Sequence, residues 1–494
     1  MTTSLFGVIT GPDFAAAEKL LAVHKPYIDG IELRLDYFGP IDQKALASFL
    51  QNCKLPVMLT VRRKDQGGYF PGTEEERLAL IESLCSLHPA YVDLEYDVPS
   101  DYRKRLFESY PHICFLSSYH DFSGSPVDFG ELYAKVQTPY AQIHKIAVTA
   151  SSSLDALRLL AFVKMHALEK KIVGIAMGEE GRITRILAPV VGSCLTYATL
   201  SEEGITAPGQ LNARELQETY HFRGLNPQTE VYCLIGDPIE ASLGAAIHNA
   251  VFANASLNAV YVKARVKKEE IPSFFSLARQ LPFKGFSVTM PLKEEVMPLL
   301  TQVSQQTEAI GACNTIKIQE GQMLGYNTDG IGALNAIERR GLVSRKHVVI
   351  IGAGGSAKAL AYEASQRGAL VTIINRTPLK AIEIANSLGC TGGGWELFPK
   401  VCESGYDVMI NCIPDSTLID EKWILPGIVA MDIVYIPKNT PFLVKALSKK
   451  CHLIFGYEMF VAQALEQELL WFSSQIDTAK AYAILEEMVV SNLN

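Results

Sequence analysis

The sequence lacks the features of a membrane-spanning, disulfide-bonded or nucleic-acid-binding protein. No apolar run reaches the roughly 18 residues of a membrane-spanning helix. The 10 cysteines form no C-x-x-C pair and no cysteine–histidine cluster with zinc-ligand spacing, so we expect reduced thiols and no metal site. Acidic residues outnumber basic ones by 53 to 45, and the formal net charge of −8 argues against nucleic acid or an anionic membrane as the main partner.

The sequence also lacks low-complexity segments, and no signal or transit peptide precedes the first apolar segment, so we expect a soluble, cytoplasmic protein. What it does have is an ordinary globular composition, with 48% hydrophobic and 20% charged residues. Local cationic pockets for small anionic ligands remain compatible with this composition. At roughly 100–200 residues per domain, 494 residues suggest about three domains.

Residues 1–220 repeat one theme, in which a short apolar strand is followed by a stretch with helical periodicity such as DFAAAEKLLAVHK. Eight such strands alternating with helices predict a (β/α)₈ TIM barrel in an α/β protein. The expected strands are 5–10, 30–36, 56–62, 91–97, 113–119, 143–149, 172–178 and 195–200.

After a polar connector at 221–229, a new strand begins at Val231. Strands and helices mix over about 230–335, with a hairpin expected at Glu320–Gly321. From 346 the alternation becomes regular and predicts a doubly wound, Rossmann-type nucleotide-binding lobe, which we expect at 336–456. A helical tail, 457–494, closes the chain.

A lysine stands in the sixth apolar segment, IHKIAVTA (143–150), where a buried strand is expected. Lys145 shares its strand face with the small residues Ala147 and Thr149, which leaves room for a ligand beside the amine. Burial disfavours the charged form of a lysine, lowers its pKa and frees a nucleophilic lone pair. A snorkelling or salt-bridged side chain would be the ordinary explanation of a lone lysine.

Barrel enzymes place their chemistry at the C-terminal ends of the strands, and several polar residues of this sequence stand there. Glu32 and Arg34 in GIELRLD share one strand face, either as a structural ion pair or as a substrate clamp. We favour the clamp, because branched apolar residues usually fill barrel interiors. Other groups that end or follow strands are Arg62, His120 and Arg185. Together with Lys145 they predict a site for a carbonyl-bearing anion.

The motifs ELR, TVR, SYHDF, KIAV, ITR and TAPGQ occur in this order, and over about residues 1–220 the sequence resembles type I 3-dehydroquinate dehydratases. The resemblance implies that Lys145 forms an imine with the substrate ketone. It also implies that His120 takes the C2 proton and then assists the loss of the hydroxyl group as water. The substrate-binding residues that it implies are Glu32, Arg34, Arg62, Arg185, Thr206 and Gln210.

Two positions depart from that family's pattern. Gln66 stands where the family usually has a glutamate that supports the catalytic histidine. An amide can orient an imidazole but does not stabilise its charged form, and Asp65 is a candidate to compensate. Thr206 stands where serine is common and keeps the hydroxyl group. The first departure bears on the rate rather than on the type of reaction.

The segment VVIIGAGGSAKA places a glycine-rich turn between an expected strand and an expected helix. With further strands after it, this turn predicts a dinucleotide site, because glycines let a pyrophosphate approach the helix N-terminus. The next strand ends in an arginine with amide and hydroxyl neighbours, where NAD sites usually have an acidic residue, so we expect NADP(H). The predicted cofactor-binding residues here are Gly352, Ala353, Gly354, Gly355, Ser356, Asn375, Arg376 and Thr377.

Lys293 follows Pro291 at an expected helix start, where a cation is disfavoured by the helix dipole, so surface decoration explains it poorly. Asp329 lies in the sequence NTDG, which turn chemistry alone would explain. The two residues are 36 positions apart, and the sequence pattern by itself does not bring them together.

The motifs VTMPLKE, GACNT, YNTDG, GAGGSA, NRT, DIVYIP and GYEMFVAQ resemble those of shikimate dehydrogenases over about 230–494. The resemblance implies that Lys293 and Asp329 form a catalytic pair that handles the hydroxyl proton during hydride transfer. It implies a substrate-binding lobe at 230–335, completed by helices in 457–494. The implied substrate-binding residues are Ser242, Thr289, Asn314, Tyr435 and Gln463, and Gly456 joins the cofactor-binding set.

This half also departs from its family at several positions. Gly244 replaces the second serine of a common S-x-S pair, which weakens carboxylate binding and leaves space for quinate, a substrate with one more hydroxyl. Ser287 replaces a common asparagine, and NCIPDS (411–416) replaces the usual NAT stretch.

The two resemblances fit one another, because 3-dehydroshikimate is the product of the first reaction and the substrate of the second. We therefore predict a bifunctional enzyme with small-molecule substrates that dehydrates 3-dehydroquinate and reduces 3-dehydroshikimate to shikimate with NADPH. Its alternatives are a quinate-oxidising enzyme, a ligand-sensing regulator built on retired enzyme domains, and a class I aldolase, which would explain Lys145 but not the second half.

Overall fold

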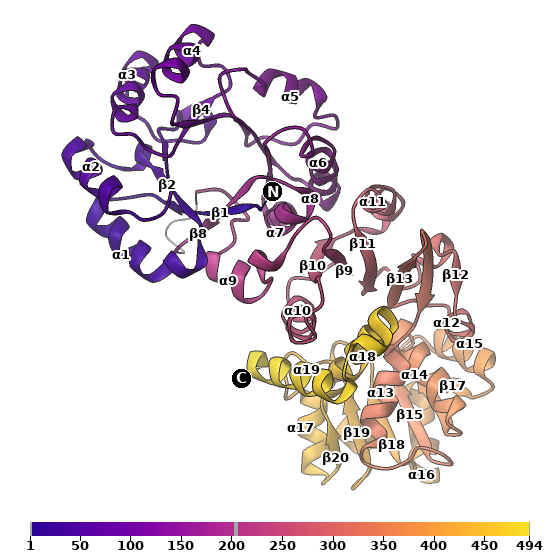
Figure 1. Cartoon of the computed structure of the whole chain (residues 1–494). Coiled ribbons are helices and arrows are strands. Elements are labelled where there is room, and N and C mark those ends of the chain that lie inside the picture. Colours follow the sequence, from indigo (N-terminus) through magenta and orange to yellow (C-terminus); the bar gives the residue numbers. More distant parts are fainter. Residues whose placement is uncertain (1, 202–205, 494) are drawn as a thin grey trace. The chain divides into compact units, whose positions relative to one another are not determined.

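The computed structural model describes residues 2–201 and 206–493 and divides into two compact units (Figure 1). The N-terminal unit comprises the residues up to Glu230 together with Asn258–Pro282, and the C-terminal unit comprises Val231–Leu257 together with the residues from Phe283 onward. The lobe boundaries expected at 335 and 457 remain predictions.

Eight parallel strands form the N-terminal unit's sheet, in the order β7-β6-β5-β4-β3-β2-β1-β8. The backbone N–H of Cys194, just before β8, donates to the carbonyl of Ile172 in β7 at 3.0 Å, so the sheet is nearly closed. The predicted barrel is therefore confirmed. The strands are β1 (Ser4–Ile9), β2 (Gly30–Arg34), β3 (Val57–Thr60), β4 (Tyr91–Glu95), β5 (Cys114–Asp121), β6 (Ile143–Thr149), β7 (Ile172–Met177) and β8 (Leu195–Thr199).

Helices connect these strands and surround them (Figure 1). Local capping helps to set where they begin: Asp13 accepts a hydrogen bond from the Ala16 N–H, and Thr73 and Glu76 form a capping box. The helices are α1 (Phe14–His24), α2 (Gln43–Asn52), α3 (Glu74–Cys85), α4 (Ser100–Ser109), α5 (Gly130–Val136), α6 (Ser153–His166), α7 (Arg182–Ile186), α8 (Ala188–Val191) and α9 (Ala213–Glu218). Strand β10 (Ala259–Arg265) and helix α11 (Ile271–Ala278) complete the unit, with α11 beside α6.

The inside of the barrel changes character along its strands. Apolar side chains such as Phe6, Met58, Leu116 and Val173 form a buried cluster. Gly30 makes room for this packing, since a Cβ there would lie 2.6 Å from Cζ of Phe6. Two residues further along β2 to β6, the inward positions become polar or charged. The inside of the barrel therefore has an apolar layer and, next to it toward the C-terminal ends of the strands, a layer of polar and charged groups.

The first sheet of the C-terminal unit includes β9 (Glu230–Gly236), β11 (Phe283–Val288), β12 (Gln302–Val303), β13 (Thr315–Gln319) and β14 (Gln322–Tyr326). These strands lie in the order β9-β11-β13-β14-β12. The hairpin between β13 and β14 is confirmed, and its two turn residues, Glu320 and Gly321, have φ values of 52° and 77°. The helix start expected at Lys293 is wrong: residues 289–296 form hydrogen-bonded turns, so the dipole argument does not apply.

The second sheet is parallel in the order β17-β16-β15-β18-β19-β20, which confirms the doubly wound nucleotide-binding pattern. Two apolar clusters lie on its two faces, one with helical residues between 333 and 385 and the other with helical residues between 398 and 446. The strands are β15 (His347–Ile351), β16 (Leu370–Ile374), β17 (Thr391–Gly393), β18 (Val408–Asn411), β19 (Val429–Asp432) and β20 (His452–Ile454). The sequence did not predict β17, because its TGG segment has no apolar signal.

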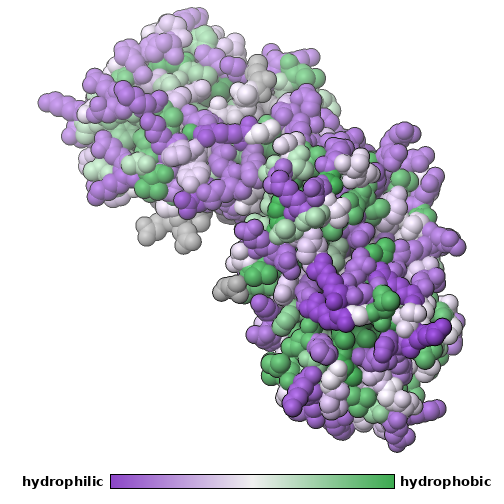
Figure 2. Space-filling model, turned by 60° about the horizontal axis from the view of Figure 1, so that its bottom comes forward, coloured by the Kyte–Doolittle hydropathy of each residue, from purple (hydrophilic) through white to green (hydrophobic). Residues whose placement is uncertain are grey.

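The unit's helices are α10 (Gly244–Asn254), α12 (Gln305–Ile310), α13 (Asp329–Glu338), α14 (Gly355–Gln366), α15 (Pro378–Leu388), α16 (Phe398–Ser404), α17 (Pro441–Ser448), α18 (Gly456–Phe472) and α19 (Thr478–Leu493). The last two form the expected helical tail, and α18 packs along α13. Hydrophilic side chains dominate the face of the molecule shown in Figure 2, with groups of apolar residues between them. In the described part of the chain, no helix is long and apolar enough to cross a membrane.

Candidate active sites

A cavity of about 50 Å³ lies at the C-terminal ends of the barrel strands. The structure brings to it all the residues that the sequence predicted for the barrel site: Glu32, Arg34, Arg62, His120, Lys145, Arg185, Thr206 and Gln210. It adds Gln66, Tyr197 and Phe122, of which the last two were not predicted. The cationic side chains within this cavity suit an anionic ligand.

Lys145 points into the cavity from β6 and is 5% exposed. Its Nζ atom lies 3.3 Å from Oδ2 of Asp93 and 4.2 Å from the centre of the Tyr197 ring. Burial lowers the pKa of Lys145, and the carboxylate of Asp93 opposes this effect. Asp93 is itself shared, because the same oxygen lies 2.8 Å from Arg62 Nη2. The lysine therefore has only part of a counter-charge, which favours a neutral, nucleophilic amine.

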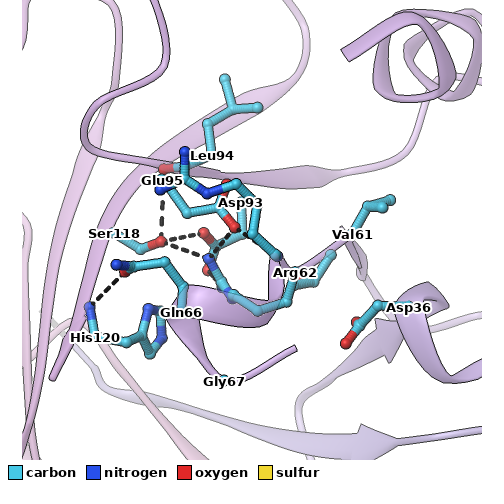
Figure 3. A network of polar contacts seen from close by, with 12 residues as sticks. Asp36, Val61, Arg62, Gln66, Gly67, Asp93, Leu94, Glu95, Ser118 and His120 are labelled. Carbon is cyan, nitrogen blue, oxygen red and sulfur yellow. Dashed lines mark hydrogen bonds and ion pairs between the residues drawn. The ribbon is translucent and has the colours of Figure 1, made fainter. Parts of the chain in front are cut away.

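The network behind the lysine is buried and charged (Figure 3). Arg62 pairs with Asp93 and, at 3.1 Å, with Glu95, and its Nη1 donates to Oγ of Ser118 at 2.9 Å. Ser118 in turn donates to Asp93. The positive charge of Arg62, followed by that of Lys145, holds the pKa of Asp93 far below its ordinary value, against the effect of burial. Asp93 thus stays charged and oriented; its position, two residues before Glu95 on one strand face, was the only sequence signal for it.

His120 ends the inward face of β5, and its backbone N–H donates to Oε1 of Gln66 at 3.0 Å (Figure 3). Among the described residues its Nδ1 atom is buried without a hydrogen-bond partner. Burial, followed by the positive charges of Arg62 and Lys145, lowers the pKa of His120 well below its ordinary value. A neutral imidazole is the form that accepts a proton. Gln66 therefore holds the backbone of His120 in place through this hydrogen bond, and its neutral amide adds no charge beside the imidazole.

Asp65 does not compensate for the missing carboxylate. Its side chain is 66% exposed and lies 3.2 Å from Nε of Arg63. Glu32 and Arg34 are not an ion pair with each other either: Arg34 makes a two-point contact with Asp36, at 2.9 and 2.7 Å, while Glu32 accepts a hydrogen bond from Thr60 at 2.7 Å. Asp36 was missed because it follows the strand.

Arg185 is the best candidate for binding a substrate carboxylate. It is 2% exposed, and its Nη1 donates to the Ala176 carbonyl at 3.0 Å, whereas Nε is buried without a partner in the described chain. Burial lowers the pKa of Arg185 to about 10, and Arg182 adds to this effect. A buried guanidinium with an unused N–H is costly unless an anion binds it. Thr206 and Gln210 line the same cavity.

The second site lies in the C-terminal unit, where Lys293 and Asp329 form an ion pair. The pairing joins a turn after β11 to the first residue of α13. Asn314 donates from Nδ2 to Oδ1 of Asp329 at 2.8 Å, and Gln463 lies 3.4 Å from the same amide nitrogen. Lys293 also donates to Oγ of Ser356 at 3.3 Å. Three further predicted residues, Asn314, Gln463 and Ser356, thus surround the lysine and its carboxylate partner.

Gln467 is a polar residue of this site that the sequence analysis missed. It accepts a hydrogen bond from Ser287 at 3.0 Å and donates to Thr315 at 2.9 Å, beside Asn314. It lies one helical turn after Gln463 on α18, and this i, i+4 spacing was the available signal. The serine that replaces the family's asparagine therefore keeps a buried hydrogen bond.

The other predicted substrate-binding residues are held by other neighbours. Ser242 accepts a hydrogen bond from the Gly244 N–H at 3.1 Å just before α10. The methyl group of Thr289 lies against Gly236, where an added Cβ would be 2.3 Å away. Tyr435 stacks on Phe460 with ring centres 4.8 Å apart, and burial raises the pKa of its hydroxyl group.

The glycine-rich turn fits a dinucleotide. Gly352 has a φ of +119° and Gly354 is the N-cap of α14. No atom of the described residues lies within 4 Å of a Cβ added to Gly354. Gly456 lets α18 approach Val434, whose carbonyl oxygen would lie 2.4 Å from an added Cβ. A cavity of about 360 Å³ opens beside Ala353, between α12, α14 and α15.

The end of β16 carries no acidic residue that would suit an unphosphorylated ribose. Asn375 donates from its amide to the Thr377 carbonyl at 3.0 Å. Arg376 and Thr377 are exposed, so both side chains are accessible to a ligand. These residues fit the 2′-phosphate of NADP.

Comparison with known proteins matches both halves of the chain. Residues 5–227 match the family model of type I 3-dehydroquinase, and residues 234–316 match that of the shikimate dehydrogenase substrate-binding domain. The shikimate biosynthesis protein AroDE of Chlamydia pneumoniae is 32% identical over 469 residues, which cover 95% of each chain.

Two further relatives and one solved structure resemble parts or most of the chain. The bifunctional 3-dehydroquinate dehydratase/shikimate dehydrogenase of Arabidopsis thaliana is 33% identical, over 90% of this chain and 77% of its own. The NADP(+) shikimate dehydrogenase of Pyrococcus furiosus is 39% identical, over 51% of this chain and 94% of its own. A crystal structure of a shikimate dehydrogenase in complex with NADP+ covers 55% of this chain and 98% of its own, with 32% identity and a TM-score of 0.50.

Proposed function

Because the chain belongs to the family of bifunctional proteins that join a type I 3-dehydroquinate dehydratase to a shikimate dehydrogenase, we propose that it catalyses both reactions. The barrel dehydrates 3-dehydroquinate to 3-dehydroshikimate, and the C-terminal unit reduces 3-dehydroshikimate to shikimate with NADPH. One observation carries this assignment: a single chain holds a buried lysine and histidine in one barrel cavity and a lysine–aspartate pair beside a dinucleotide turn.

In the barrel, the neutral amine of Lys145 attacks the substrate ketone, and loss of water leaves an imine. His120 takes a proton from C2 while the iminium nitrogen accepts the electrons, and it then gives the proton to the leaving hydroxyl group at C1. Hydrolysis of the imine consumes one water and frees the amine. Arg34 and Arg185 hold the carboxylate, and the low pKa of His120 keeps it neutral before the first proton transfer.

In the C-terminal unit, a bound NADPH supplies the hydride for the substrate's ketone carbon. Lys293 donates a proton or a hydrogen bond to the oxygen that becomes the hydroxyl group, and Asp329 orients Lys293. Asn314 holds the carboxylate of Asp329 by a hydrogen bond, and Gln467 holds Thr315, the residue next to Asn314. Asn375, Arg376 and Thr377 would hold the 2′-phosphate of such a cofactor, and the N-terminus of α14 would hold its pyrophosphate.

The other interpretations receive less support. A sensor built on retired enzymes would not need the reactive groups of both sites, and these are in place. Three chlamydial relatives that cover nearly the whole chain are named shikimate biosynthesis proteins, which favours the reduction of 3-dehydroshikimate over catabolic oxidation of quinate. The cytoplasmic location remains a prediction from the sequence.

Addition of 3-dehydroquinate and NADPH to the purified protein tests both activities in one assay. We expect the NADPH absorbance to fall and shikimate to accumulate. Growth of enone absorbance without loss of NADPH would contradict the reductase assignment. No change with 3-dehydroquinate, but turnover of added 3-dehydroshikimate, would contradict the dehydratase assignment.

A further inference from the structure

Lys293 contacts two different segments of the C-terminal unit. Its ammonium group pairs with Asp329 at the start of α13, and it donates a hydrogen bond to Oγ of Ser356, the second residue of α14, at 3.3 Å. An ammonium group has three N–H donors. With both contacts formed, one N–H is still available for a substrate oxygen.

The rest of the Lys293 side chain lies along the glycine-rich turn. A Cβ atom added to Gly355 would lie 3.7 Å from Cδ of Lys293. The Lys293 carbonyl accepts a hydrogen bond from the Cys313 N–H at 2.7 Å, and the adjacent Glu294 pairs with Lys358, in the first turn of α14, at 2.9 Å. The turn that carries the lysine and the turn that begins α14 are therefore packed and tied together.

Ser356 stands where the phosphates of a dinucleotide are expected. Helix α14 is 12 residues long, and its N-cap residue is Gly354, which has no side chain that could accept hydrogen bonds from the first N–H groups. The first N–H groups of a helix have no partner within it and attract anions. A hydroxyl group both accepts and donates, so Oγ of Ser356 is able to accept from Lys293 and donate toward such an anion.

We propose that Ser356 is a positioning residue for Lys293 and couples occupation of the dinucleotide site to the Lys293–Asp329 pair. A hydroxyl group that donates to an anion becomes a stronger acceptor, so a bound phosphate strengthens the hydrogen bond from Lys293. The ammonium group is then held in its place for the substrate. Coupling of this kind is reciprocal, so each ligand raises the affinity for the other. The inference rests on the proposed reductase function.

Binding calorimetry tests the coupling without turnover. Shikimate is titrated into the full-length protein with and without saturating NADP+. In the wild type we expect NADP+ to tighten shikimate binding at least about fivefold. Ser356→Ala should reduce this factor below about twofold even when NADP+ is saturating, and it should also weaken NADP+ binding without shikimate, because the hydroxyl group that donates to the phosphate is lost. Ser356→Thr keeps the hydroxyl group and should restore coupling.

Ser365→Ala, near the other end of α14, is the matched control and should behave as the wild type. Steady-state kinetics give a second readout. At saturating NADPH, Ser356→Ala should lower kcat for 3-dehydroshikimate on the order of tenfold, because the hydrogen bond to the Lys293 ammonium group is lost. The KM for NADPH should rise as well, because the hydrogen bond to the phosphate is lost.

Three outcomes would overturn the inference. These are equal coupling in Ser356→Ala and the wild type, a wild-type protein that binds both ligands without coupling, and a Ser356→Ala variant whose kcat at saturating NADPH equals that of the wild type. In the last case Ser356 is a phosphate ligand only. A wild type that binds neither shikimate nor NADP+ contradicts the reductase function itself, and the inference falls with it.

Discussion

Both sites place a lysine beside an aspartate, but the surroundings of the two lysines differ. Lys145 lies inside the barrel, 3.3 Å from a carboxylate that also pairs with Arg62. The side chain of Lys293 is 16% exposed, and the neutral amide of Asn314 holds the second oxygen of its partner, Asp329. In the barrel, the Asp93 carboxylate is shared between two cations, Lys145 and Arg62. In the C-terminal unit, the second neighbour of the Asp329 carboxylate is a neutral amide, so Lys293 does not share this carboxylate with another cation in these contacts.

This difference matches the chemistry proposed for each lysine. An amine that forms an imine must be neutral, and burial with a shared counter-charge lowers the pKa of Lys145. A lysine that donates a proton or hydrogen bond benefits from a carboxylate of its own. The comparison teaches that the neighbours of the aspartate, rather than the lysine–aspartate contact, separate a nucleophile from a donor.

Lys145→Met should have the largest effect. Dehydration of 3-dehydroquinate should fall at least about 10⁴-fold, because no imine forms without the amine. Reduction of 3-dehydroshikimate should stay within about twofold of the wild type, since the second site is independent. Enone absorbance measures the first activity and NADPH absorbance the second. Lys171→Met, an exposed change before β7, is the control.

Borohydride trapping sharpens this prediction. With 3-dehydroquinate present, borohydride should leave a stable adduct on Lys145 that mass spectrometry locates. An adduct on another lysine, or none, would reject the role proposed for Lys145.

Asp329→Asn breaks the other half of the comparison. Reduction of 3-dehydroshikimate should fall about 10³-fold, because the charged partner of Lys293 is lost while its shape is kept. Dehydratase activity should not change. Equal activity of the variant and the wild type would show that the pair is structural.

The buried pair of His248 and Glu468 has no role in the proposed reactions, so its contribution is expected in the free energy of unfolding rather than in activity. His248 Nδ1 lies 2.5 Å from Oε1 of Glu468, and both side chains are almost fully buried. His248→Leu should destabilise the C-terminal unit by about 3 kcal/mol, because it leaves a buried carboxyl group without this partner. Glu468→Gln keeps a hydrogen bond and should cost about 1 kcal/mol. Urea unfolding followed by tryptophan fluorescence measures this unit alone, since it contains Trp395, Trp423 and Trp471.

Arg376→Ala tests the cofactor preference. The KM for NADPH should rise about 10- to 30-fold, while the KM for NADH should change less than about twofold, because only NADPH carries the 2′-phosphate. Steady-state kinetics with both cofactors give the two values. Lys400→Ala, an exposed change on α16, should affect neither. Parallel increases for both cofactors would place Arg376 outside the phosphate site.

Gln66→Glu should have the smallest effect, a change in pH dependence. His120 acts as a base only when neutral, and its lowered pKa moves the loss of activity on acidification well below pH 6.5 in the wild type. A nearby carboxylate favours the imidazolium and raises the pKa of His120, so the acid limb of kcat/KM should move up by roughly one pH unit. Asp65→Asn, which removes an exposed carboxylate, should not move it. An unshifted profile in Gln66→Glu would mean that Gln66 acts on the backbone alone.

Much of the fold followed from local patterns. Apolar segments of the right length predicted the eight barrel strands, and the turn at Glu320–Gly321 predicted a hairpin, because both signals lie within a few residues. Strand β17 was missed since glycines carry no apolar signal, and the expected helix at Lys293 proved to be a series of turns. Asp36 was missed because it lies just after its strand, and Gln467 was missed because its partners Ser287 and Thr315 lie far from it in the sequence.

The sequence by itself determined the barrel, the dinucleotide turn and the identity of the reactive lysines, through short-range periodicity and motifs of known families. Only the tertiary structure decided what each reactive group meets: Lys293 beside Asp329 and Ser356, His120 beside Gln66, and Lys145 beside a carboxylate shared with Arg62. The physical reason is that charge and burial act across space. In each of the two sites, residues 36 to 63 positions apart along the chain are joined by hydrogen bonds. No local sequence pattern shows which groups compete for the same carboxylate.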